Sequence, residues 1–146
     1  MEELLAFAYL LELDLVSEDM YEEKLNKLFL ENPNNEDLLE LEFLSGKRKE
    51  TIVYIRTHMD YNSMDFDKFG RELFGLLKLI YEDMEIHEFG SAMYSLWESL
   101  AGSLQDKVPF WTLSYADDPL SYGDEEQTKK IYEEMLAYYD DQCSKP

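Results

Sequence analysis

The chain has 146 residues, of which 45% are hydrophobic and 14% aromatic, enough apolar material to form a core without disulfides. Its 33 acidic and 13 basic residues give a net charge of −20, which argues against direct binding to nucleic acids or anionic lipids because both carry the same sign. The longest apolar run, Leu4 to Leu11, is far shorter than the roughly 20 residues that span a bilayer.

Helical periodicity begins near the N-terminus. Residues 2–16 are apolar on most faces, which predicts a buried helix. Ser17 is a typical start for a second helix over 17–31, because its hydroxyl can accept a hydrogen bond from the first turn. Asn35 begins a third helix over 36–45 for the same reason.

Residues 47–60 are ambiguous. Ile52, Ile55 and Met59 keep helical spacing, whereas the segment from Thr51 to Ile55 is rich enough in β-branched residues for a strand. We favour a helix, because a lone strand in a helical chain would have no partner.

The second half of the chain predicts three further helices. The first covers residues 65–84 and carries Gly70 and Gly75, which lower its helix propensity and would allow a neighbouring helix to approach closely. The second of these helices covers residues 87–104 and the third covers residues 124–141. Between them, residues 107–123 form an irregular but ordered connection.

These elements predict an all-α fold. We expect a single domain over residues 1–146, built as an irregular bundle or an orthogonal array of six or seven helices. The sequence contains no fixed-period repeat and no linker that would divide it.

Residues suited to catalysis or metal binding do not occur in recognisable patterns. His58 and His87 lie outside the His-Glu-x-x-His and Glu-x-x-His motifs of zinc and di-iron sites. The acidic segments that begin at Asp60 and Asp117 fail the residue pattern of a calcium loop. Cys143, close to the end of the chain, is a poor candidate for a nucleophile. We therefore expect no enzymatic activity, no metal and no cofactor.

The charge is unevenly distributed along the chain. Residues 1–46 carry a net charge of −11, residues 47–78 carry +2 and residues 79–146 carry −11. We expect the two acidic arms to pack around the near-neutral middle and to form one negative surface. The alternative is that the acidic residues serve only to keep the protein in solution.

The densest candidate site is the segment from Tyr115 to Glu126, a loop that leads into the last long helix. Tyrosines provide rigid contact area and carboxylates select lysine and arginine on a partner. The predicted partner-binding residues are Tyr115, Asp117, Asp118, Tyr122, Asp124, Glu125 and Glu126. An alternative explanation for the last three is that they stabilise the start of the helix.

A short motif near the C-terminus adds a resemblance. Tyr138-Tyr139-Asp140-Asp141 resembles the tyrosine pair beside aspartate in immunity proteins of nuclease colicins. In size, acidity, helical pattern and tyrosine content, the whole chain is similar to the immunity proteins of bacterial toxin systems. The resemblance implies a protein that blocks a cognate toxin, and we transfer no site residue from it.

Taken together, the sequence predicts a cytoplasmic acidic binding protein. The N-terminus lacks the positive region of a signal peptide, and a single cysteine fits a reducing compartment. We expect an immunity protein or inhibitor that covers the active cleft of a basic toxin, such as a nuclease, without itself contacting nucleic acid or membrane. The alternatives are a helical adaptor or regulatory domain with an unrelated partner, and a nucleic-acid mimic.

Overall fold

A computed structural model of the chain describes residues 1–143, and the side chains of residues 1–140. Within this range all regular secondary structure is helical, so the predicted all-α class is confirmed. Nine α-helices and two short 3₁₀ helices are present in the described residues, where six or seven helices were predicted. The chain divides into two compact units, residues 1–69 and a second unit that begins at Gly70. The single domain over residues 1–146 stays a prediction.

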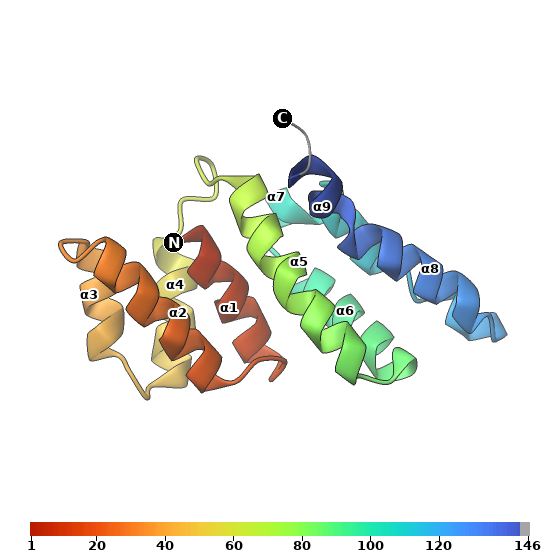
Figure 1. Ribbon diagram of the computed structural model, residues 1–146, viewed down its shortest axis with the longest axis horizontal. Helices are drawn as coiled ribbons and strands as arrows, with labels where there is room; N and C mark the ends of the chain where they lie inside the picture. The colour runs from red at the N-terminus through yellow and green to blue at the C-terminus, as the bar shows by residue number, and fades with distance from the viewer. Residues whose placement is uncertain (144–146) are drawn as a thin grey trace. The chain divides into compact units, whose positions relative to one another are not determined.

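The first unit consists of four helices and the beginning of a fifth. Their bounds are α1 (Glu2–Glu12), α2 (Glu18–Glu31), α3 (Glu36–Phe43), α4 (Arg48–His58) and α5 (Phe66–Asp83), the last of which continues into the second unit. As Figure 1 shows, α1 packs against α2 and α4, and α2 packs against α3. The sequence predicted α1 to be a buried helix, and every side chain from Leu4 to Leu11 is at most 3% exposed. Each buried leucine contributes about 2 kcal/mol to this core.

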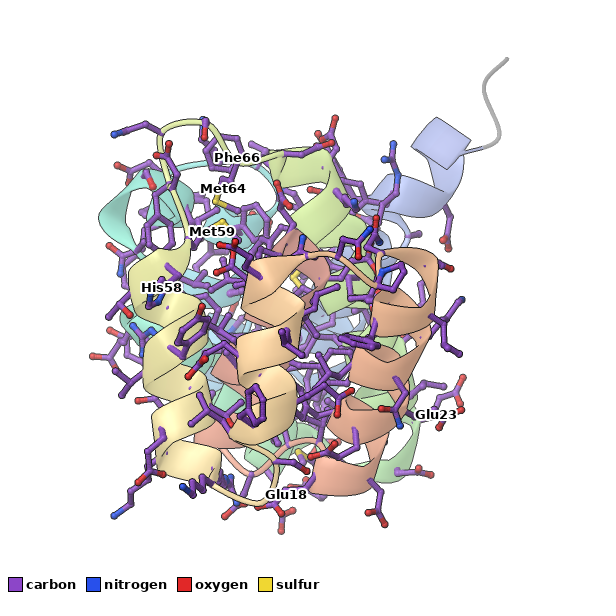
Figure 2. The ribbon with its side chains drawn as sticks, turned by 90° about the vertical axis from the view of Figure 1, so that its left-hand side faces the viewer. Glu18, Glu23, His58, Met59, Met64 and Phe66 are labelled. Atoms are coloured by element: carbon purple, nitrogen blue, oxygen red, sulfur yellow. The ribbon has the colours of Figure 1, made fainter. Side chains whose placement is uncertain are left out.

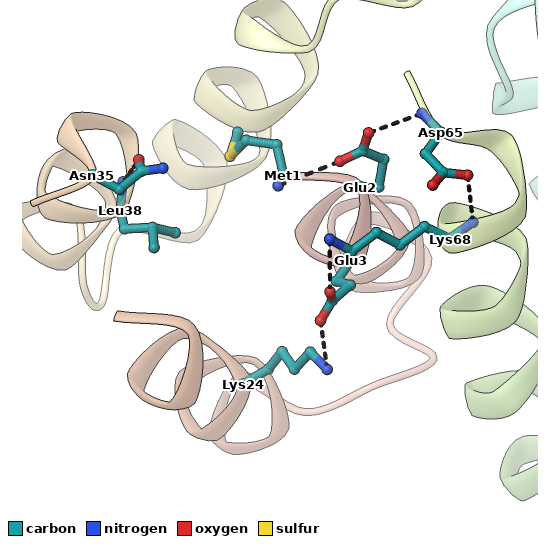
Figure 3. Close-up of polar contacts among 8 residues, drawn as sticks. All are labelled: Met1, Glu2, Glu3, Lys24, Asn35, Leu38, Asp65 and Lys68. Carbon is teal, nitrogen blue, oxygen red and sulfur yellow. Dashed lines mark hydrogen bonds and ion pairs between the residues drawn. The ribbon is translucent and has the colours of Figure 1, made fainter. Parts of the chain in front are cut away.

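Two of the predicted helix starts are confirmed in atomic detail. The hydroxyl of Ser17 accepts a hydrogen bond from the backbone N–H of Met20 at 3.2 Å. The side-chain oxygen of Asn35 accepts one from the N–H of Leu38 at 3.1 Å, which Figure 3 includes. Each bond satisfies one of the free N–H groups that a helix leaves at its beginning.

The predicted end of the first helix, residue 16, is wrong. The helix ends at Glu12, because Asp14 adopts a left-handed backbone conformation with φ of 58°. The guanidinium of Arg48, from α4, donates to the carbonyl oxygen of Leu11 and pairs with Asp14 at 2.6 Å. A basic side chain from a distant helix thus stabilises the end of α1.

Residues 47–60 contain helix α4, which confirms the helical interpretation. Ile52 and Ile55 on its inner face are buried. Arg56 pairs with Glu12 of α1 at 2.6 Å, as Arg48 pairs with Asp14. The basic middle of the chain therefore neutralises acidic residues within its own unit.

A polar network connects the start of α1 to α2 and to the start of α5 (Figure 3). Glu2 accepts a hydrogen bond from the backbone N–H of Asp65 at 2.9 Å. Glu3 lies between two ammonium groups, with Lys24 at 2.8 Å and Lys68 at 3.5 Å. Burial alone would raise the pKa of Glu3, but the two lysines more than offset burial and hold its pKa below the ordinary value.

The second unit has a core rich in aromatic residues. Its elements are the rest of α5, α6 (Ile86–Ser99), α7 (Gly102–Gln105), η1 (Phe110–Ser114), η2 (Asp118–Tyr122), α8 (Glu125–Leu136) and α9 (Tyr138–Cys143). Phe74 of α5 contacts the rings of Phe110 and Tyr139, and Phe89 of α6 contacts the ring of Tyr132. These edge and tilted ring contacts favour a specific packing of the helices.

Within the described residues, the structure has two more α-helices than the seven predicted ranges, because two of the predicted helices are each interrupted. The predicted helix over 87–104 divides into α6 and α7, because Leu100 and Ala101 adopt extended conformations. The side-chain amide of Gln105 then donates to the carbonyl oxygen of Trp97 at 3.0 Å, a group at the end of α6. The predicted helix over 124–141 divides into α8 and α9 at Ala137.

The two glycines of α5 differ in their surroundings. A Cβ atom on Gly70 would lie 2.0 Å from the hydroxyl oxygen of Tyr139, so the predicted close approach is confirmed there. A Cβ atom on Gly75 would meet nothing within 4 Å, and the same prediction is wrong for that position. Among the described helices, none is both long and apolar enough to cross a membrane.

Candidate interaction surface

Four aromatic side chains form a connected row in the second unit. Tyr94 and Trp97 come from α6, Trp111 comes from η1, and Tyr115 follows η1 directly. Successive ring centroids are 6.0, 6.0 and 6.5 Å apart. Tyr94, Trp111 and Tyr115 are 41%, 47% and 40% exposed, so the row presents large apolar rings to solvent.

The geometry of the 3₁₀ segment determines which side chains are exposed. A 3₁₀ helix has three residues per turn, so every third residue falls on the same face. Phe110, Leu113 and Ala116 follow this spacing and are buried. Trp111 and Tyr115 are outside this inward face and are exposed.

Trp97 is the fixed member of the row. Its indole N–H donates to the carbonyl oxygen of Gln105 at 3.1 Å, and the Gln105 amide donates back to the Trp97 carbonyl oxygen. This reciprocal pair orients the half-buried indole that contacts Trp111. A binding surface with a fixed support loses less conformational entropy when it engages a partner.

Carboxylates lie near both ends of the row. Glu98 is exposed and follows Tyr94 by one helical turn on α6. Asp118 is exposed at the other end, where its backbone N–H donates to the carbonyl oxygen of Tyr115 at 2.9 Å. We name the combined set the aromatic–acidic surface, which consists of Tyr94, Trp97, Glu98, Trp111, Tyr115 and Asp118.

The predicted partner-binding residues are placed differently from one another. Tyr115 and Asp118 belong to the aromatic–acidic surface, and Tyr122 is 70% exposed on η2. Asp117 is half-buried and packs against Gly90 of α6. A Cβ atom added to Gly90 would lie 3.0 Å from the Cβ of Asp117. Burial, and next the charge of Asp118, raise the pKa of Asp117 above its ordinary value.

Asp124, Glu125 and Glu126 lie at the start of α8, where negative charge stabilises a helix. The carboxylate of Asp124 accepts a hydrogen bond from the N–H of Gln127 at 3.0 Å. Glu125 and Glu126 occupy the first turn and are exposed, and Glu125 lies 3.9 Å from the imidazole of His87. Asp124 thus stabilises the helix, as the alternative interpretation expected.

The other titratable candidates have local partners. The ring of His58 stacks on Tyr54 at 3.8 Å. His87 lies 2.6 Å from Glu85, whose hydrogen bond raises the pKa of His87. Among the described residues, no three side chains of histidine, cysteine, aspartate or glutamate gather where they could hold a metal ion. The side chain of Cys143 is outside the described part of the chain.

The tyrosine motif of residues 138–141 contributes to packing. Tyr139 is 5% exposed, contacts Phe74 and lies under the cation of Arg71. Asp140 pairs with Lys78. The side chain of Asp141 is outside the described residues.

Sequence reasoning missed four members of the aromatic–acidic surface: Tyr94, Trp97, Glu98 and Trp111. One signal was available, since Tyr94 is an aromatic residue off the inward stripe of its helix. The contribution of Trp111 depends on the 3₁₀ geometry of η1, which helical and strand periodicities do not reveal.

Comparison with known proteins gives no match: no family model, no curated protein and no solved structure is significantly similar to this chain.

Proposed function

We propose that this chain is an acidic binding protein that neutralises a basic protein partner, and that the aromatic–acidic surface is its docking site. The observation that carries the proposal is the exposed row of aromatic rings with a carboxylate near each end. Exposed aromatic rings are favoured as anchors of protein interfaces. In keeping with the resemblance to immunity proteins, the partner is a toxin whose active cleft this surface covers.

The chemistry of the surface suits arginine and lysine. A guanidinium group can stack on an exposed ring of the row, and the carboxylates near the ends of the row can accept hydrogen bonds from arginine or lysine. The chain already uses such contacts internally, because the guanidinium of Arg56 lies 4.9 Å from the ring centre of Tyr9. A basic active cleft that binds phosphate groups presents the same cations to an inhibitor.

The net charge of −20 adds a long-range component. It would attract a basic partner and accelerate association, and salt would weaken this attraction by screening it. The predicted behaviour is therefore fast, salt-sensitive association followed by slow dissociation that depends on the aromatic rings.

The test first asks whether a gene adjacent to that of this chain encodes a basic protein, and the absence of such a protein would contradict the proposal. Binding of that protein is then measured by biolayer interferometry at 50 and 300 mM NaCl. We expect Trp111→Ala to weaken binding at least about tenfold, chiefly through faster dissociation. Asp118→Lys should mainly slow association. Leu79→Ala is the control, because Leu79 is a 56% exposed apolar residue of α5 in the same unit.

Three outcomes would contradict the proposal. They are tight binding that Trp111→Ala leaves unchanged, an equal loss with Leu79→Ala, and no complex at either salt concentration. In the supporting case, co-expression with this chain also abolishes the partner's toxicity, and Trp111→Ala restores that toxicity.

A further inference from the structure

A second surface with binding character lies in the first unit, between α3 and α4. Figure 2 shows these two helices side by side, with His58 labelled at one end of α4. A shallow, open groove of about 430 Å³ follows them. We name it the α3–α4 groove, and its lining includes Glu40, Leu44, Glu50, Val53, Tyr54 and Thr57.

The groove occupies a face of α4 that does not pack on α1. Thr51, Ile52 and Ile55 form the buried face of α4. Val53 lies in the middle of the helix on another face and is 59% exposed. Phe43 on the neighbouring α3 is 72% exposed and Leu39 is 46% exposed. Val53 and Leu44 are thus apolar members of the groove lining, and the groove leaves Val53 open to solvent.

The floor of the groove is held in place. The hydroxyl of Tyr54 donates to the carboxylate of Asp37 on α3 at 2.8 Å, which connects the two helices. The ring of Tyr54 also stacks on His58, with 18° between the ring planes. A groove fixed in this way needs little rearrangement to receive a partner.

The charges around the groove indicate whether an acidic or a basic partner would bind there. Helix α3 contains four acidic residues and no basic residue. The arginines of α4 pair with acidic residues of the α1 end, Arg48 with Asp14 and Arg56 with Glu12, while Lys49 lines the groove. Carboxylates therefore dominate around the groove, and a basic occupant would be attracted to it.

We propose that the α3–α4 groove docks an amphipathic helix of a partner, with an apolar stripe flanked by lysine or arginine. The stripe would cover Val53, Leu44 and Tyr54, and the basic flank would face Glu36 and Glu40 of α3. The segment of α4 from Lys49 to His58 is about 14 Å long, enough for about two and a half turns of a docked helix. The groove shares no residue with the aromatic–acidic surface, so the inference does not rest on the proposed function.

The test uses a fluorescein-labelled, 18-residue amphipathic helix made of leucine and lysine, titrated with the full chain and followed by fluorescence anisotropy. We expect saturable binding to the unmodified chain. Val53→Asp should weaken it at least about tenfold, because the new charge would have to lose water under the apolar stripe. A scrambled peptide of the same composition should bind at least about tenfold more weakly.

Leu30→Asp is the matched control. Leu30 is an 81% exposed apolar residue of α2 in the same unit, and the exchange adds the same negative charge as Val53→Asp. If the attraction were purely electrostatic, both variants would change the affinity for the peptide by the same factor. If the peptide docks in the groove, the affinity of Leu30→Asp stays within about twofold of that of the unmodified chain. Circular dichroism of both variants checks that the helices are intact.

Each contrary result overturns the proposal. Absence of binding at 100 µM chain, equal binding by the two variants, or equal binding of the scrambled peptide would each do so. Weakening by Trp111→Ala would instead place the peptide on the aromatic–acidic surface. Sedimentation velocity that finds a dimer, lost only in Val53→Asp, would show that the occupant is a second copy of this chain.

Discussion

At the scale of single residues, surroundings separate acidic side chains that look equivalent in the sequence. Glu3 lies between Lys24 and Lys68, and these cations favour its charged form. Asp117 is half-buried against α6, where loss of water and the charge of Asp118 disfavour its charged form. An excess of carboxylates therefore includes some that stabilise the fold and some that oppose it.

Replacing Glu3 with glutamine should destabilise the protein at pH 7 by about 1 kcal/mol, a value limited by the partial exposure of the pair. The pKa of Glu3 is lowered in the folded state, so its contribution is complete above its ordinary pKa of 4.5 and is lost as pH falls through the folded value. The difference between the unmodified chain and Glu3→Gln should accordingly shrink as pH is lowered from 7 to 3.5. Urea unfolding at several pH values measures it.

Asp117→Asn is the matched control, since it is also an acid-to-amide exchange. The pKa of Asp117 is raised in the folded state, so its contribution to stability is greatest at low pH and is lost as pH rises through the folded value. This exchange should leave stability at pH 7 unchanged or slightly higher, by less than about 1 kcal/mol. Equal destabilisation by both exchanges would contradict the roles assigned to the two carboxylates.

The sequence predicted the candidate site only in part, for reasons visible in neighbouring residues. Two of the residues that it singled out for partner binding, Tyr115 and Asp118, are exposed. It could not separate Asp117 from Asp118, because the local 3₁₀ geometry turns one toward α6 and the other toward solvent. Nor could it place Trp111 beside Trp97, because that contact joins segments distant in the sequence.

At the scale of helices, α5 carries two glycines with different roles. Gly70 is buried and accommodates the ring of Tyr139, whereas Gly75 is exposed with open space where a side chain would be. Helix propensity alone would favour alanine at both positions. Packing should reverse that preference at Gly70 only.

Gly70→Ala should therefore destabilise the protein by about 1–3 kcal/mol, because the new methyl group forces the ring of Tyr139 to move. Gly75→Ala should stabilise it by about 0.5–1 kcal/mol, because it improves helix propensity without a new contact. Thermal unfolding of the two single variants compares them directly. Stabilisation by both exchanges would show that Tyr139 does not need the space above Gly70.

The same distinction explains how far the helices could be predicted. Hydrophobic spacing and capping residues such as Ser17 and Asn35 are local signals, and the helices that depend on them were found. The ends that were missed depend on distant groups or on backbone geometry. The end of α1 is stabilised by Arg48 of α4, and the interruption between α6 and α7 depends on extended residues at Leu100 and Ala101.

At the scale of the whole molecule, the negative charge divides evenly between the two compact units. The first contains 17 acidic and 7 basic residues and the second contains 16 and 6, so each has a net charge of −10. In the first unit, Lys24, Arg48, Arg56 and Lys68 pair with acidic residues at the ends of α1. Most of the remaining acidic side chains of that unit are on α2 and α3, where they repel one another and can attract a basic partner.

This imbalance predicts that moderate salt stabilises the protein. Raising NaCl from 50 to 500 mM screens both the ion pairs and the repulsion, but the repulsion is the larger effect because acidic residues outnumber basic ones by 20. The melting temperature should rise by roughly 4 °C, equivalent to about 1 kcal/mol for a chain of this size. The double variant Glu23→Lys/Glu31→Lys, at exposed positions of α2, raises the net charge to −16 and should gain less from salt. Two results would contradict this: an equal rise in melting temperature for the double variant and the unmodified chain, or a fall in melting temperature with salt. Either would show that repulsion among the carboxylates does not limit stability. The charge would then carry no cost, and binding to a partner would not be needed to explain why it persists.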